Sequence, residues 1–147
     1  MWHSNRWMIA VLIIVALQLA ACATQTPESS TSSQPARVER LGETGLSRVI
    51  LTAEAGKRLG IETAPVRDAQ VRGKLRKVVP YSTVFYDLKG ETWVYTKPQA
   101  LTFVRARISV DYIDGDLAVL LEGPPSGTEV VTVGAPELYG TEFGVGQ

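Results

Sequence analysis

Short apolar runs alternate with turn-forming residues over most of the chain, and this pattern predicts β-strands. The runs are four to twelve residues long and are bounded by clusters of Gly, Pro, Asp and Ser, which is typical of antiparallel strands. We therefore predict a mainly β fold, a small antiparallel barrel-like or sandwich-like domain with one short helix, over residues 46–147. Its later strands are predicted at 81–86, 92–96, 101–112, 116–121 and 128–133.

The residues between these strands have the chemistry of turns. Asp and Asn side chains bond to nearby backbone groups, and Gly accepts the positive φ that tight hairpins require. The predicted structural turn residues are Asp87, Gly90, Asp114, Gly115, Gly123 and Gly127.

The one predicted helix follows a short apolar strand at residues 48–51. Thr52 is placed to cap a helix over 53–59, and Gly60 is placed to end it. Gly56 weakens the middle of this helix, so it must depend on tertiary packing. An extended piece, 61–66, comes next.

Strand 101–112 divides into two sides by its period of two. Arg105 and Arg107 lie on a polar side that is interrupted by Phe103, and Val104 and Ala106 belong to an apolar side.

The stretch "VRDAQVRGKLRKVVP", residues 66–80, has five basic residues in 15, although the whole chain is balanced at 15 basic and 15 acidic residues. A binding arm, a solvated strand and a join between two parts of a larger fold are the three interpretations. Arg72, Lys74 and Arg76 are spaced by two, which favours one solvated face of a strand. No nucleic acid partner is predicted, because nearby aromatics fit core and cross-strand pairs better than a stacking platform. These are Tyr81, Tyr86, Trp93, Tyr95 and Phe103.

The first 21 residues have the pattern of an export signal. Arg6 precedes an apolar run at 7–17, which is shorter than the roughly 20 residues that a membrane-spanning helix needs. The segment Leu19-Ala20-Ala21-Cys22 resembles the lipobox of bacterial lipoproteins. The resemblance implies cleavage between Ala21 and Cys22 and acylation of Cys22, palmitate included. An ordinary cleaved signal, or an uncleaved anchor with Cys22 incidental, is the alternative.

Residues 22–45 are rich in Ser, Thr and Pro, and we predict a flexible tether there because the segment has little apolar surface to bury. By resemblance to the lipoprotein sorting rule, Ala23 directly after the cysteine favours the periplasmic side of the outer membrane over the inner membrane.

The chemistry left after the signal argues against an enzyme. His3, Met1 and Met8 all precede Cys22, so a chain that starts at an acylated Cys22 has no imidazole for proton transfer and no soft ligand for zinc or copper. No cofactor and no metal site are predicted. Asp111, Asp114 and Asp116 could suggest a calcium loop, but the residues between them lack ligand oxygens, so we predict a hairpin turn.

Three segments together resemble the periplasmic adaptors (membrane fusion proteins, HlyD-type) of RND efflux pumps. "LTAEAGKRLGIETAPV" resembles their opening strand, helix and strand, and "VVPYSTVFYDLKGETWVYT" resembles the re-entry into the membrane-proximal domain. "FVRARISVDYIDGDLAVLLEGPPSGTEVVTVGAPELYG" resembles their final strands. The match covers roughly 46–140, with Thr83 where alanine is usual.

The chain departs from that family between Val66 and Val79. There the adaptors have a β-barrel half, a lipoyl half and a helical hairpin, whereas this chain has about a dozen residues without an apolar heptad. The basic stretch is therefore interpreted as a join, a turn or strand pair that closes the gap.

The resemblance implies a lipid-anchored, non-enzymatic periplasmic protein. Its implied partners are the membrane, through the lipid, and an RND transporter or a full-length adaptor. A carrier of small molecules or metals that feeds a pump, and a degenerate remnant without activity, are the other interpretations.

Overall fold

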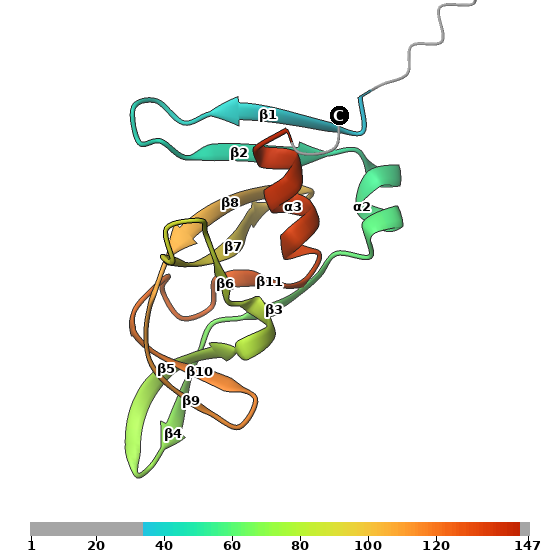
Figure 1. Cartoon of the computed structure of the whole chain (residues 1–147). Helices are drawn as coiled ribbons and strands as arrows, with labels where there is room; N and C mark the ends of the chain where they lie inside the picture. Colours follow the sequence, from blue (N-terminus) through green and yellow to red (C-terminus); the bar gives the residue numbers. More distant parts are fainter. Residues whose placement is uncertain (1–33, 145–147) are drawn as a thin grey trace, which may run out of the picture. The chain divides into compact units, whose positions relative to one another are not determined.

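The computed structural model describes residues 34–144 and has the predicted mainly β fold. Its strands form two antiparallel sheets, and neither sheet closes on itself (Figure 1). The larger sheet has the order β1 (Ala36–Arg40), β2 (Ser47–Leu51), β8 (Thr102–Arg107), β7 (Thr92–Gln99), β11 (Glu129–Val133) and β3 (Glu62–Pro65), with the short β6 (Phe85–Tyr86) beside β7. The smaller sheet has the order β4 (Arg67–Val71), β5 (Lys74–Pro80), β10 (Leu117–Glu122) and β9 (Ser109–Asp114).

The predicted helix is confirmed as α2 (Ala53–Leu59). The hydroxyl of Thr52 accepts a hydrogen bond from the backbone N–H of Ala55 at 3.1 Å, and Gly60 ends the helix in the left-handed conformation. Packing explains why residue 56 is a glycine, since a Cβ there would lie 2.6 Å from the Cδ2 atom of Leu101.

The single strand predicted over 101–112 is wrong in one respect. The chain leaves the larger sheet after Arg107 and enters the smaller sheet at Ser109, with Ile108 buried between them. β7 begins at Thr92, so the two hydrogen bonds between Ile108 and Thr92 are the last that this strand makes with β7, and the chain is free to change sheet after them.

The basic stretch forms a strand pair, and its interpretation as a join between two parts of a larger fold stays a prediction. β4 and β5 form a regular antiparallel hairpin in which Val71 lies opposite Lys74. The two residues between them, Arg72 and Gly73, have φ of 52° and 75°, as a type I′ turn requires.

The predicted tether, 22–45, is too long at its C-terminal end. Residues Ala36–Arg40 form β1, which pairs with β2 in an unbroken antiparallel register. The reason is the otherwise open edge of β2 together with Ala36, whose side chain packs against the core. The predicted signal, 1–21, and the rest of the tether up to residue 33 lie outside the described residues.

A second helix, α3 (Ala135–Glu142), was not predicted from the sequence. It covers the larger sheet (Figure 1). Its Leu138 is fully buried in a core cluster with Val49, Tyr95 and Phe103. A second cluster lies between the two sheets around Val79, Val94 and Ala118. A short 3₁₀ turn, η1 (Tyr81–Thr83), leads from β5 back toward the larger sheet.

No helix between residues 34 and 144 is long and apolar enough to cross a membrane.

Candidate functional site

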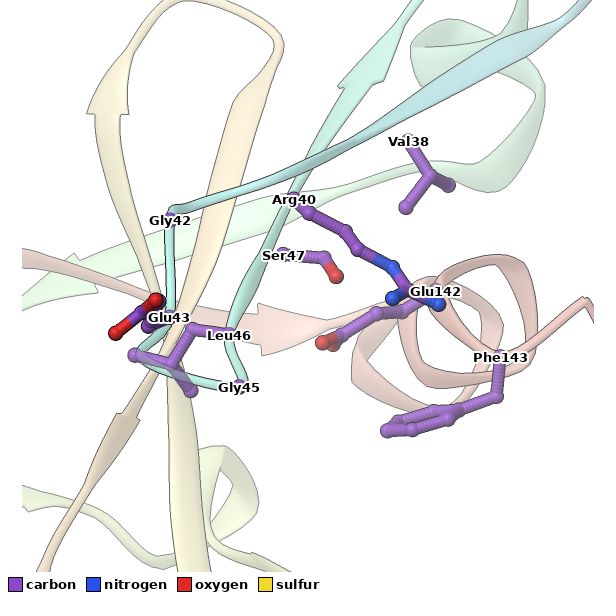
Figure 2. Close-up of a pocket in the computed structure, with 9 residues that line it drawn as sticks. All are labelled: Val38, Arg40, Gly42, Glu43, Gly45, Leu46, Ser47, Glu142 and Phe143. Carbon is purple, nitrogen blue, oxygen red and sulfur yellow. The ribbon is translucent and has the colours of Figure 1, made fainter.

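A groove of about 570 Å³ between the β1–β2 hairpin and the end of α3 is the candidate functional site. Figure 2 shows Val38 and Arg40 of β1 on one side of it and Glu142 and Phe143 on the other, with the hairpin loop at residues 42–46 along its length. The side chain of Arg40 extends toward the end of α3. The groove therefore combines apolar walls with charged groups, as a surface for a peptide or a small polar molecule does.

Beneath the groove lies a buried polar cluster that joins α3 to the sheet. The Nε atom of Arg105 donates to Glu142 Oε2 at 2.8 Å, and the hydroxyl of Tyr95 donates to the same oxygen at 2.6 Å. The side chains of Arg105 and Glu142 are only 7% and 2% exposed. A carboxylate in the last turn of a helix opposes the helix dipole, so Glu142 depends on these two donors.

Two aromatic rings enclose the guanidinium of Arg105. Its Cζ atom lies 4.6 Å from the centroid of the Trp93 ring and 5.0 Å from that of Phe143. Burial raises the pKa of Tyr95 far above its ordinary value, and the hydrogen bond to Glu142 adds to that rise. Tyr95 is therefore a fixed hydrogen-bond donor near neutral pH.

A second hollow of about 330 Å³ shares Leu46 and Phe143 with the groove and extends to the β6–β7 turn. Asp87 lies in that turn. Its Oδ1 atom accepts from the backbone N–H groups of Lys89 and Glu91 at 2.8 and 2.9 Å, and its Oδ2 atom accepts from the indole N–H of Trp93 at 3.1 Å. Asp87 thus fixes the ring that stacks on Arg105.

The pKa of Asp87 gives a pH-dependent prediction. Desolvation acts to raise this pKa, but the hydrogen bonds from Glu91, Lys89 and Trp93 outweigh it and leave the pKa below its ordinary 3.8. The carboxylate therefore stabilises the fold fully above 3.8, and this contribution is lost as pH falls through the lowered value. We expect Asp87→Asn to lower the free energy of unfolding near neutral pH, with a difference from wild type that shrinks on acidification.

Urea unfolding at a series of pH values checks this expectation. Asp116→Asn, at an exposed aspartate of the β9–β10 turn, is the matched control and should follow the wild-type curve. A constant difference between Asp87→Asn and wild type down to strongly acidic pH would contradict the assignment.

Two of the three acidic residues weighed as a calcium loop contact the basic hairpin instead. Asp111 pairs with Arg76 at 2.6 Å, and Asp114 pairs with Arg72 at 3.4 Å. The Cζ atom of Arg72 also lies 4.3 Å from the ring centroid of Tyr112. Among residues 34–144 no group of three or more His, Cys, Asp or Glu side chains has the geometry to hold a metal ion.

The predicted turn residues lie at the following places. Gly90 and Gly115 have φ of 78° and 59° within the β6–β7 and β9–β10 connections, and Gly127 has φ of 90° before β11. Gly123 follows β10, where a Cβ would lie 2.8 Å from Leu120 Cδ1. Asp87 and Asp114 make the contacts given above. Ala21 and Cys22 lie outside the described residues.

The sequence did not indicate Glu142 or Phe143 as site residues, and its pattern placed Arg105 on a polar side of its strand. Arg105 is buried because α3 covers that side. The Gly-Ala-Pro start at residue 134, with Pro early in the helix, is the local signal that could have found α3. Of the aromatics expected in core and cross-strand pairs, Tyr95 and Phe103 are buried, whereas Tyr81 and Tyr86 are 45% and 59% exposed.

No family model and no curated protein matches the chain. Among solved structures, the chain is similar to an NMR structure of 180 residues that contains the N-terminal metal-binding site and the membrane proximal domain of SilB from Cupriavidus metallidurans CH34. The identity is 22%, the TM-score is 0.45, and the match covers 54% of this chain. It spans 44% of the SilB chain, which is less than half of that structure's length.

Proposed function

We infer that the chain is a non-enzymatic periplasmic protein, held on a membrane by lipid at Cys22, which acts by contact with a component of an RND-type efflux pump. The partner is the transporter or a full-length adaptor. The outer membrane is the favoured site of anchoring, since Ala23 follows the cysteine.

One observation supports this function most directly. The three sequence segments that resemble the adaptors interleave in one sheet: β3 of the first segment pairs with β11 of the third, and β7 of the second lies between β8 and β11. Such interleaving suits a domain that the chain leaves and re-enters. By the resemblance to the adaptors, their long excursion would lie between the first and second segments, where this chain has the β4–β5 hairpin.

The surface available for a partner has the chemistry of a protein contact. The groove beside α3 exposes Phe143 and Val38 together with the charged Arg40, which is a mixture typical of protein interfaces. The buried Arg105–Glu142 pair below it fixes the α3 side of the groove, which lowers the ordering cost of binding on that side.

The test is affinity capture of the full, tagged chain from solubilised membranes of the source bacterium, followed by mass spectrometry. Cys22→Ser is the matched variant, because it keeps the β domain and removes the sulfur that the lipid requires. We expect a transporter or adaptor with the wild-type chain, and a marked loss both of membrane association and of that partner with Cys22→Ser. Recovery of no transporter, adaptor or channel would contradict the function.

A melting experiment on the same purified chain distinguishes the carrier interpretation from contact with a pump. A carrier is stabilised by its cargo, so its melting temperature rises with the concentration of the right small molecule or metal. A thermal shift in a ligand panel, together with an empty capture, would favour a carrier over a pump contact.

A further inference from the structure

β1 is the outermost strand of the larger sheet, and one of its edges has no neighbour among the described residues (Figure 1). Its bonding pattern follows from two hydrogen bonds at its ends, from Leu41 N–H to Leu46 O and from Thr52 N–H to Pro35 O. In an antiparallel ladder the bonded pairs recur every second residue. Arg37 and Glu39 therefore bond to β2, and the backbone groups of alternate residues point outward. These are Ala36, Val38 and Arg40.

The sequence of β1, Ala-Arg-Val-Glu-Arg, is complementary to itself in the antiparallel direction. With Val38 opposite Val38 of a second copy, Arg37 lies opposite Glu39, and Ala36 lies opposite Arg40. The outward backbone groups of the two copies then meet, because Val38 and the Val38 of the second copy form a hydrogen-bonded pair. Arg37 and the Glu39 of the second copy form a non-hydrogen-bonded pair, the kind in which facing side chains are closest.

The side chains of β1 suit this arrangement on both faces. On the outer face Glu39 already lies 2.7 Å from Arg37 and 3.6 Å from Arg48 of its own chain, so a second Arg37 from across the new edge adds to a favourable cluster. On the α3 side Val38 is 39% exposed and lines the groove near Phe143, so a facing Val38 covers apolar surface.

The other edge strands suit self-pairing less well. β3 has a register shift against β11 and ends in Pro65, which has no N–H to donate. β9 has two register shifts against β10. β4 is regular, but centring it on Ala69 would place Asp68 opposite Gln70 and form no ion pair.

We propose that two copies of this chain associate through β1, antiparallel about a two-fold axis at Val38, so that their larger sheets become continuous. The interface is isologous, with each copy giving the same strand. The association needs neither a pump partner nor lipid on Cys22, and it covers Val38, which also lines the groove.

Charge reversal in trans tests the proposal. Arg37→Glu places glutamates opposite each other in a homodimer, and Glu39→Arg does the same with arginines. Each variant alone should associate about tenfold more weakly than wild type, because two like-charged pairs face each other. A mixture restores Arg opposite Glu at both positions, so the two variants should pair with each other at wild-type strength.

Co-expression of the full chain with two different tags, followed by capture on one tag, measures this pairing. Arg58→Glu, on the exposed side of α2, is the matched control and should leave capture unchanged. A role of Arg37 and Glu39 within one chain could not produce recovery only in the mixed pair.

A crosslink gives a second measurement that does not depend on charge. Cα atoms of a hydrogen-bonded antiparallel pair are about 5.5 Å apart, within the range of about 4.4–6.8 Å that disulfides span. Val38→Cys in the full chain should therefore form a covalent dimer under mild oxidant. Leu88→Cys, at a side chain 98% exposed in the β6–β7 turn, should not.

The rescue in the mixed pair supports the proposal, and so does the crosslink of the Val38→Cys variant unless capture is unchanged by both charge reversals. If one tagged copy captures the other equally well with and without each charge reversal, the proposal is overturned. It is also overturned if both the rescue and the crosslink are absent. Capture of a different protein that is lost with Arg37→Glu, with no second copy recovered, assigns the edge to another partner and also overturns it.

Discussion

Replacing Glu142 by alanine is expected to lower the free energy of unfolding by about 3–5 kcal/mol, because it leaves the Arg105 guanidinium buried without its partner. The hydroxyl of Tyr95 loses its acceptor at the same time. A loss of this size is a large fraction of the roughly 5–15 kcal/mol that stabilises a typical domain. Much of the variant should therefore have α3 detached, or be unfolded at 37 °C.

Equilibrium unfolding in urea measures the effect, and the double variant Arg105→Met/Glu142→Leu shows its origin. Replacing both charges with apolar side chains of similar volume is often neutral or stabilising, so the double variant should recover most of the loss. Glu137→Ala on the exposed side of α3 should cost no more than about 1 kcal/mol. If the double variant is as unstable as Glu142→Ala, the unpaired charge is not the cause.

The parts of the fold that the sequence predicted are those with local signals. Thr52 and Gly60 mark the two ends of α2 by their own side-chain and backbone preferences, and the structure has the helix between them. The β4–β5 hairpin is likewise local, since a two-residue turn at Arg72 and Gly73 fixes its register.

The parts that the sequence did not predict depend on residues far apart in the chain. α3 has Gly134 as its N-cap, without a side chain to bond the helix, and Gly140 in its interior, so its local preference for a helix is weak. What holds it is burial of Leu138 and the contact of Glu142 with Arg105, 37 residues earlier. Alternation along β8 cannot reveal that a later helix covers Arg105.

The candidate site was unpredictable for the same reason. Its groove is lined by residues 38–47 and by residues 142 and 143, and neither segment has a motif of its own. Asp87 was identified as a turn residue, and that local role is what its bonds to Lys89 and Glu91 describe. Its bond to Trp93, which links the turn to the buried cluster, could be identified only from the three-dimensional structure.

Gly134→Ala is the second substitution with a large expected effect, a loss of about 2–4 kcal/mol in the free energy of unfolding. Gly134 has φ of 97°, in the left-handed region that costs about 1–2 kcal/mol for a residue with a Cβ. The new Cβ would also overlap the Cδ1 atom of Ile61, and overpacking of this kind costs about 1–3 kcal/mol. Because Gly134 accepts the first helical bond of α3, from Leu138 N–H at 3.1 Å, the displacement reaches the helix that carries Glu142.

Gly60→Ala separates the two contributions. Gly60 also has a positive φ, 61°, but a Cβ there meets no atom within 4 Å, so this variant reports the backbone strain alone. In an Ile61→Ala background the overlap at residue 134 is removed, and Gly134→Ala should then cost only as much as Gly60→Ala does. Urea unfolding of Gly60→Ala, Gly134→Ala, Ile61→Ala and the Gly134→Ala/Ile61→Ala double variant gives the cost of the backbone strain and the cost of the overlap. Equal costs for Gly134→Ala in the wild-type and Ile61→Ala backgrounds would mean that Ile61 is not what makes glycine necessary at the start of α3.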